Sequence, residues 1–233
     1  MAKTLVLAVS LLSLALLATS GACGGGGGGG TTIDIKDFDT ARFTMSQTTT
    51  SDGDVAQVTG EGVVDNRQQA LSVTLEGESS PGTIAIGPKV YAYNEADQRW
   101  ESFTEAADGQ VGFGRPYWPQ FWRDAVQIQN LGGESLPSAE TTRYLLNFDR
   151  EKVRQRLQAE GTEGEGQAVE VRQAEVEVWV NDSSRYAVKL TFRLDLFYGG
   201  ASMKIEVTSI FSDFGAEVQI QAPEGVTPTP VGP

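Results

Sequence analysis

Three segments in the second half of the chain alternate apolar with polar residues: AVEVRQAEVEVWV at 168–180, YAVKLTFRLDLF at 186–197 and SMKIEVTSIF at 202–211. This period of two predicts strands with one dry face, because successive side chains of a strand point to opposite sides of the sheet. The positions expected on the dry face are Val176, Val178, Val188, Leu190, Phe192, Leu194, Leu196, Met203, Ile205 and Val207. The positions expected on the solvated face are Glu175, Glu177, Lys189, Arg193, Asp195, Lys204 and Glu206.

Weaker runs of the same kind come earlier in the chain. Turn-forming segments such as SDGD at 51–54 and NDSS at 181–184 separate them. Sequential strands joined by short turns form an antiparallel meander. The predicted fold class is therefore mainly β (α+β), an antiparallel sheet with a few short covering helices. The weaker runs are RFTMSQT from Arg42, QVTGEGVV from Gln57, ALSVTLE from Ala70, GTIAIG from Gly82, KVYAY from Lys89 and RYLLNF from Arg143.

Helical signals are few. The segment DREKVRQRLQAEG at 149–161 offers Asp149 as N-cap and an apolar stripe of Val153 and Leu157, which predicts a short, mostly solvated helix. The segment RPYWPQFWRDAVQIQNL at 115–131 has apolar residues at helical spacing and predicts a second, more apolar helix.

The apolar side of such a sheet is larger than two short helices can cover. About ten strands, ~4.8 Å apart and ~20 Å long, present roughly 950 Å² of dry face. Two helices of ~10 residues cover roughly 300 Å². The rest is hidden either by a sheet that curls until its own dry faces meet, or by an apolar ligand held in an open half-barrel. The pattern leaves both arrangements open and favours the first, because most barrel interiors of this size are filled by their own side chains.

The first 22 residues have the layout of a secretory signal peptide. Lys3 precedes an apolar run from Leu5 to Leu17, and the small residues Ser20 and Ala22 lie where a signal peptidase accepts them. Cleavage after Ala22 makes Cys23 the new N-terminus. The residues SGAC resemble the lipobox of bacterial lipoproteins, although Ser20 stands where leucine is usual, and this resemblance implies that Cys23 is acylated. The alternatives are an uncleaved membrane anchor and a freely secreted protein.

Seven glycines at 24–30 predict a flexible tether after this cysteine. A linker of about nine such residues spans ~16 Å, so it holds a folded domain close to a membrane. The expected location is extracytoplasmic, lipid-anchored at the outer face of the cytoplasmic membrane or in the periplasm. The expected organisation is a signal peptide at 1–22, an acylated cysteine and Gly-rich tether at 23–32, a folded domain at 33–224 and a disordered Pro-rich tail at 225–233.

Composition excludes several classes of function. The formal net charge is −13 and no basic cluster offsets it, which excludes a nucleic-acid partner. The chain contains no histidine, so it lacks the usual general base and the commonest metal ligand. The spacing of its 31 acidic residues singles out no catalytic pair. We therefore expect a protein that is not an enzyme, with no catalytic residues, cofactor or metal.

Five segments in a fixed order carry a resemblance to a known group. They are TGEGVVD at 59–65, IAIGPKVYAYNEADQRW at 84–100, TTRYLLNFDREKV at 141–153, VEVWVNDSSRYAVKLTFRL at 176–194 and IEVTSIFSDFGAEVQIQAPEG at 205–225. This order is similar to the LolA-like superfamily of bacterial envelope lipoproteins, in particular its LppX and LprG branch. Members of the group generally open with a helix, whereas TTIDIKDFDTARF at 31–43 is too polar and β-branched to favour one.

The resemblance implies an antiparallel half-barrel covered by helices, with a hydrophobic cavity that carries acylated lipids or glycolipids through the cell envelope. Aromatic residues at Trp118, Phe121 and Trp122 suit a lid over the cavity or, alternatively, a plug inside the core. The alternative function is an envelope sensor or protein-interaction module with a filled barrel and an unidentified envelope partner. The residues expected to line the cavity are Phe43, Met45, Leu71, Val73, Ile84, Ile86, Val178, Leu190, Phe192, Leu194, Met203, Ile205 and Val207.

Overall fold

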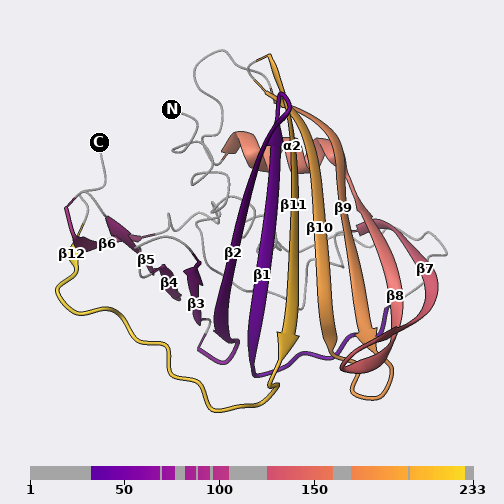
Figure 1. The fold of residues 1–233 in the computed structure, drawn as a ribbon, viewed down its shortest axis with the longest axis horizontal. Helices are drawn as coiled ribbons and strands as arrows, with labels where there is room; N and C mark the ends of the chain where they lie inside the picture. The colour runs from indigo at the N-terminus through magenta and orange to yellow at the C-terminus, as the bar shows by residue number, and fades with distance from the viewer. Residues whose placement is uncertain are drawn as a thin grey trace.

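The computed structural model describes residues 33–68, 70–76, 82–87, 89–94, 97–104, 125–159, 169–198 and 200–228. They form a 12-stranded sheet in the order β12-β6-β5-β4-β3-β2-β1-β11-β10-β9-β8-β7 (Figure 1). The predicted class, a mainly antiparallel half-barrel sheet, is confirmed. The elements are β1 (Thr40–Ser51), β2 (Asp54–Asp65), β3 (Ala70–Leu75), β4 (Thr83–Ile86), β5 (Lys89–Asn94), β6 (Arg99–Thr104), β7 (Ala125–Leu136), β8 (Ala139–Phe148), α2 (Arg150–Ala159), β9 (Val169–Asn181), β10 (Ala187–Tyr198), β11 (Ala201–Ser212) and β12 (Thr227–Pro228).

Two meanders make up the sheet apart from β12. Strands β1 to β6 follow one another in space as they do in sequence, and so do β7 to β11. The turn between β1 and β2 has Asp52 and Gly53 at positive φ (49° and 94°), which the favoured two-residue hairpin turn requires. Strand β1 then pairs antiparallel with β11, starting at Arg42 opposite Ser212. This pairing joins the two meanders.

Helix α2 forms as the sequence predicts. The Asp149 Oδ1 atom accepts hydrogen bonds from the backbone N–H groups of Glu151 (2.9 Å) and Lys152 (3.2 Å), so Asp149 is the N-cap. Val153 and Leu157 are buried in the core, and the helix packs on β9. In Figure 1, α2 lies across the sheet toward the end where β1 turns into β2.

The prediction of a second helix at 115–131 is wrong for residues 125–131, which the structure describes. Ala125–Leu136 is strand β7, which pairs antiparallel with β8. Register shifts at Val126 and Leu131 interrupt the alternation of this strand, and bulges of this kind obscure a period of two in the sequence. Residues 115–124 lie outside the described residues.

Strand β1 begins at the lower end of the sheet in Figure 1, and aromatic side chains pack together near this start. Residues 33–38 enter this region without regular structure, in agreement with the expectation that no helix forms at this part of the chain. The ring of Phe38 lies 5.2 Å from that of Phe214, 6.0 Å from Phe211 and 6.2 Å from Tyr186, measured between centroids. The segments before β1 and after β11 are thereby packed together.

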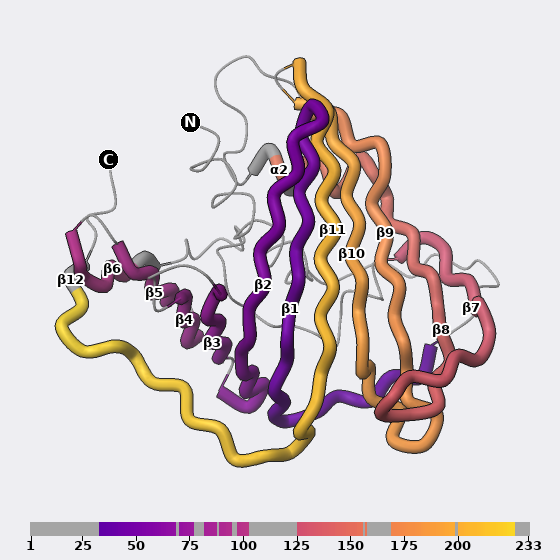
Figure 2. Tube along the Cα trace, in the orientation of Figure 1, coloured from indigo at the N-terminus to yellow at the C-terminus, as the bar shows by residue number. Residues whose placement is uncertain are grey.

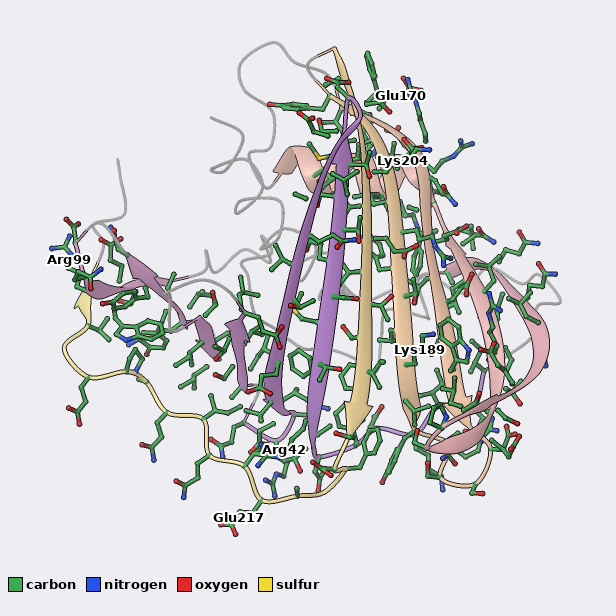
Figure 3. The ribbon with its side chains drawn as sticks, in the orientation of Figure 1. Arg42, Arg99, Glu170, Lys189, Lys204 and Glu217 are labelled. Carbon is green, nitrogen blue, oxygen red and sulfur yellow. The ribbon has the colours of Figure 1, made fainter. Side chains whose placement is uncertain are left out.

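The chain after β11 follows the same end of the sheet. Figure 2 shows residues 213–226 running below β1, β2 and β3 toward β6, and Figure 3 labels Arg42 and Glu217 at this end. Thr227 and Pro228 then form β12, parallel to β6. The prediction of a disordered tail from residue 225 is therefore wrong for these two residues, because they pair with the edge of the sheet.

Gly62 of β2 makes room for an aromatic ring. Gly62 lies opposite Phe43 of β1, and a Cβ atom at Gly62 would be 2.5 Å from the Phe43 Cζ atom and too close to the Ser72 carbonyl oxygen. No real Cβ comes so close to a carbon atom. Gly62, the second glycine of the segment TGEGVVD, therefore lets the Phe43 ring lie against the β2 backbone.

We expect Gly62→Ala to lower the free energy of unfolding by about 1–3 kcal/mol, because the Phe43 ring and the β3 backbone must both move. Urea denaturation of this variant and of Gly133→Ala measures the effect. Gly133 is the matched control in β7, since its Cβ would meet the Thr141 carbonyl oxygen at 3.9 Å. Equal denaturation midpoints for the two variants would contradict the packing described for Phe43.

Candidate ligand-binding face

The face of the sheet on which α2 packs, called the inner face below, carries one continuous apolar cluster. Strands β1, β3, β8, β9, β10 and β11 contribute most of it, together with Val153 and Leu157 of α2. Each member is at most 8 % exposed. The predicted cavity residues that belong to this cluster are Phe43, Met45, Leu71, Val73, Val178, Leu190, Phe192, Leu194, Met203, Ile205 and Val207.

Two predicted cavity residues point the other way. Leu71 of β3 is opposite Ala85 of β4, and Ala85 is buried in the inner cluster. Because side chains alternate along a strand, Ile84 and Ile86 lie on the opposite face, where both are partly buried. The prediction for Ile84 and Ile86 is therefore wrong. In the segment GTIAIG the small residue, Ala85, lies on the inner face. The prediction chose Ile84 and Ile86 because they are larger and more hydrophobic.

A bulge changes the expected position of Val188. Ala187 pairs with Val180 and Lys189 pairs with Trp179, so Val188 has no partner on β9. Ala187 joins the inner cluster, whereas Val188 is buried outside it. The expectation that Val188 shares the dry face with Leu190 is wrong, because the extra residue shifts the alternation at the start of β10.

The remaining predicted functional residues lie outside the described residues. These are Cys23, with the signal peptide and tether around it, and the lid residues Trp118, Phe121 and Trp122. Within the described ranges, no helix is both long and apolar enough to cross a membrane. In the same ranges, no group of three or more Cys, Asp or Glu side chains is placed to hold a metal ion.

Sequence reasoning missed three polar residues on the inner face. Gln47 and Thr49 continue the alternation of Met45 along β1, and Ser209 lies between Val207 and Phe211 on β11. Gln47 is 1 %, Thr49 5 % and Ser209 8 % exposed. The alternation along β1 and β11 gives their positions. They were not selected as candidates because polar residues are not expected on the apolar face of a sheet.

Helix α2 covers a small part of the inner face. The long strands β2, β1, β11, β10 and β9 span 12 or 13 residues each, so together they present roughly 950 Å² at ~3.3 Å per residue and ~4.8 Å between strands. A helix of 10 residues is ~15 Å long and ~10 Å wide and covers roughly 150 Å². Something other than α2 must cover most of this face.

The outer face carries a network of ions across β8 to β11. Glu177 Oε2 accepts hydrogen bonds from Arg143 at 2.6 and 2.9 Å, and Glu177 Oε1 accepts one from Arg193 at 2.7 Å. Arg193 also donates to Glu206 at 2.7 Å. Lys189 of β10, labelled in Figure 3, lies 4.1 Å from the centre of the Trp179 ring. These contacts tie neighbouring strands together on the side that faces away from α2.

Glu177 was expected to be solvated, and this expectation is wrong: the residue is 8 % exposed. Burial by itself would raise the pKa of Glu177, but the hydrogen bonds from Arg193 and Arg143 outweigh it and hold the pKa below its usual value. The carboxylate therefore stays charged at neutral pH and stabilises the folded sheet while it is charged.

The outer face also has a depression of about 270 Å³ beside this network. Seven of its nine lining residues have charged or polar side chains, so an acyl chain there would lie against charged groups. Its polar lining residues are Thr48, Thr50, Gln173, Arg193, Asp195, Lys204 and Glu206. The inner face is thus the better candidate for an apolar ligand.

Fold and site together define an open antiparallel half-barrel with an apolar inner face and a charged outer face. Solved structures similar to this chain include the lipoprotein LppX of Mycobacterium tuberculosis, with 14 % identity, a TM-score of 0.48 and coverage of 79 % of this chain and 90 % of that one. LprF of Mycobacterium bovis has 11 % identity, a TM-score of 0.39 and coverage of 81 % and 90 %.

The comparison also finds the MucA/MucB complex of Pseudomonas aeruginosa, with 10 % identity, a TM-score of 0.35 and coverage of 79 % of this chain and 56 % of that chain. These are similarities of fold, and they include the branch that the sequence resembles. No family model matches the chain, and no curated protein matches it either.

We expect Glu177→Gln to lower the free energy of unfolding by about 1–2 kcal/mol at pH 7, because Arg143 and Arg193 lose a charged partner that is shielded from water. The folded-state pKa of Glu177 is lowered, so its stabilisation is complete above the unfolded value of about 4.3 and is lost as pH falls below it. Urea denaturation at pH 7 and at pH 3 therefore shows a difference from the unsubstituted protein that shrinks in acid.

The matched control is Glu170→Gln on the same strand, since the Glu170 side chain is 63 % exposed in its ion pair with Arg172. That change should leave the denaturation midpoint almost unaltered at both pH values. A Glu177→Gln difference of the same size at pH 3 as at pH 7 contradicts the charge-based explanation.

Proposed function

We propose that this protein is a membrane-anchored envelope lipoprotein that binds the acyl chains of a lipid or glycolipid on the inner face of its half-barrel and carries or presents that lipid. The observation that carries the proposal is the continuous apolar inner face, which extends from β3 to β9 and is far larger than α2 can cover. An acyl chain is long, narrow and apolar, and therefore suits such a face.

The energetics of burial are sufficient for this role. Each CH₂ group removed from water contributes ~0.8 kcal/mol, so a 16-carbon chain contributes about 12 kcal/mol before the costs of ordering. The aromatic cluster of Phe38, Phe211 and Phe214 occupies the lower end of the sheet. Acyl chains would therefore lie along the middle and upper parts of β1, β11 and β10. No reacting group is required, in line with a protein that is not an enzyme.

The proposed cavity lining consists of the predicted residues that share the inner face, without Ile84 and Ile86. Trp118, Phe121 and Trp122 remain the proposed lid over this lining. Acylation of Cys23 remains the proposed link to the membrane, with the glycine run at 24–30 as the tether. The proposed location is accordingly extracytoplasmic, at the outer face of the cytoplasmic membrane or in the periplasm.

One observation favours a second function, an envelope sensor or protein-interaction module with a filled barrel. The members of the inner cluster are at most 8 % exposed, so the protein itself buries them. A filled interior would leave the charged outer face as the surface that meets a protein partner. This alternative predicts that no lipid copurifies with the protein.

The anchor is tested by Cys23→Ala in a bacterial host. We expect the variant to leave the membrane fraction and appear in the soluble extracytoplasmic fraction, because Ser20 and Ala22 still suit an ordinary signal peptidase while no thiol remains to be acylated. Fractionation followed by immunoblotting measures the change. A variant that stays in the membrane would show that the run from Leu5 acts as an uncleaved span.

The ligand is tested with the full chain carrying Cys23→Ala, purified without detergent from the extracytoplasmic fraction. Organic extraction and mass spectrometry should find an acylated lipid in a stoichiometric amount. An empty extract, together with no binding of a fluorescent fatty-acid probe, would favour the filled barrel instead.

The inner face is tested by adding Leu194→Glu to this protein. Leu194 is 1 % exposed on the inner face, so we expect the lipid-to-protein ratio to fall roughly tenfold and the denaturation midpoint to fall as well. The control is Ile210→Glu, since Ile210 is 49 % exposed on the outer face of the neighbouring strand. If both variants keep the lipid equally well, the acyl chains do not lie on the inner face.

A further inference from the structure

Strand β7 is a free edge of the sheet. In Figure 1 it forms the right-hand margin, and within the described residues it pairs with β8 alone. The opposite margin differs, because β12 pairs with the edge of β6 there. Eight of the 12 residues of β7 are exposed, which leaves the backbone groups along its outer edge open to another strand.

The sequence of β7 lacks the residues that usually protect an edge strand. Edge strands commonly carry lysine or proline, which discourage pairing with another chain. Strand β7 contains neither, and its large apolar residues Val126 and Leu131 are 63 % and 40 % exposed. Bulges interrupt the strand at these two residues, but 127–130 and 132–136 pair regularly with β8. These stretches are therefore suited to pair with an extended segment on their other side.

A row of alternating charges on the outer face ends at β7. Glu206 of β11 lies 2.7 Å from Arg193 of β10, and Arg193 lies 2.7 Å from Glu177 of β9. Arg143 of β8 lies 2.6 Å from Glu177 and 3.4 Å from Glu134 of β7. From β11 to β7 the charges are thus negative, positive, negative, positive and negative. A further strand would continue this order with a cation beside Glu134.

The Glu134 carboxylate is available to such a cation. Its side chain is 39 % exposed, and the Arg143 guanidinium lies nearer to Glu177 than to Glu134. On the inner face of β7, Ile128 lies opposite Leu146 of β8 and packs against the inner cluster. Because side chains alternate along a strand, an added strand would place basic residues beside Glu134 and apolar residues beside Ile128.

Charge and area argue against a second copy of this chain as the occupant. Each copy has a formal net charge of −13, and β7 itself has no cation to place beside Glu134. Twelve residues at ~3.3 Å each and a sheet ~10 Å thick cover roughly 400 Å² per copy, half of the ~800 Å² per partner of stable complexes. A small contact of this kind suits a transient complex with a basic segment.

We propose that the edge of β7 binds an extended segment of a partner protein by strand addition, and that apolar and basic residues alternate in this segment. The partner backbone pairs with β7, its basic side chains lie beside Glu134, and its apolar side chains extend the inner face by one strand. This inference does not depend on lipid binding.

The test uses a dye-labelled decapeptide of alternating Val and Lys. Its affinity for the full chain carrying Cys23→Ala is measured by fluorescence anisotropy in about 0.15 M salt, where charge attraction reaches only ~8 Å. The first control peptide has methyl groups on its backbone nitrogens, which removes the donors for strand pairing and keeps the charge. The second alternates Val and Glu. We expect both control peptides to bind at least tenfold more weakly.

The edge is located with Glu134→Lys, which should weaken binding of the Val and Lys peptide roughly fivefold, because like charges then face each other. The matched control is Glu217→Lys, which makes the same change in net charge at an exposed position after β11 and should alter the affinity less than twofold. If Glu134→Lys does not fold, hydrogen exchange of the unsubstituted protein gives the test, since the peptide should slow exchange of the β7 amides.

Each other outcome overturns the proposal. Equal losses for the two variants would indicate general charge attraction, and equal affinity for the methylated peptide would exclude strand pairing. A Val and Lys peptide that does not bind excludes the proposed occupant. If the protein alone forms a stable dimer in analytical ultracentrifugation and Leu131→Lys dissociates it, the edge belongs to a second copy.

Discussion

The pairing of β1 with β11 is the interaction on which the rest of the structure depends. The other pairings of long strands join chain neighbours through turns, whereas this one joins the beginning of the domain to its end. Closing so long a loop costs entropy that local turns do not cost. The segments before β1 and after β11 contribute to this closure. Phe38 packs on Phe214, and the Gly215 N–H donates to the Thr40 carbonyl oxygen at 2.9 Å. Without this pairing the inner face would be two narrow strips.

The two faces of strands β8 to β11 have different roles. On the outer side, Arg143 of β8 and Arg193 of β10 bind the carboxylates of β9 and β11 through charged hydrogen bonds. On the inner side, Leu190, Phe192 and Leu194 of β10 contribute to an apolar surface suited to acyl chains. Because alternation couples the two sides, the ionic contacts outside help to hold the apolar residues inside at fixed positions without placing any charge among them.

Several features could be predicted from local signals. The period of two in β10 and β11 placed Leu190 and Ile205 on the same face, and Asp149 marked the start of α2. Errors arose where a bulge shifts the alternation, as at Val188 and along β7. A bulge has no composition of its own, so a sequence pattern does not reveal it. The error at Ile84 and Ile86 has another cause, since a strand of four residues has too few positions to fix its face.

The sequence by itself determined the class of protein: a mostly antiparallel sheet with one dry side, preceded by a segment with the features of a lipoprotein signal. These properties are local, since they follow from alternation, turn residues and capping, and each is specified within a few neighbouring residues. The tertiary structure alone decided that β1 lies beside β11, and hence that Met45 and Ser209 lie opposite each other on the inner face. It also decided that Glu177 is buried between two arginines. Both outcomes depend on strands far apart in the chain, whose pairing no local signal specifies.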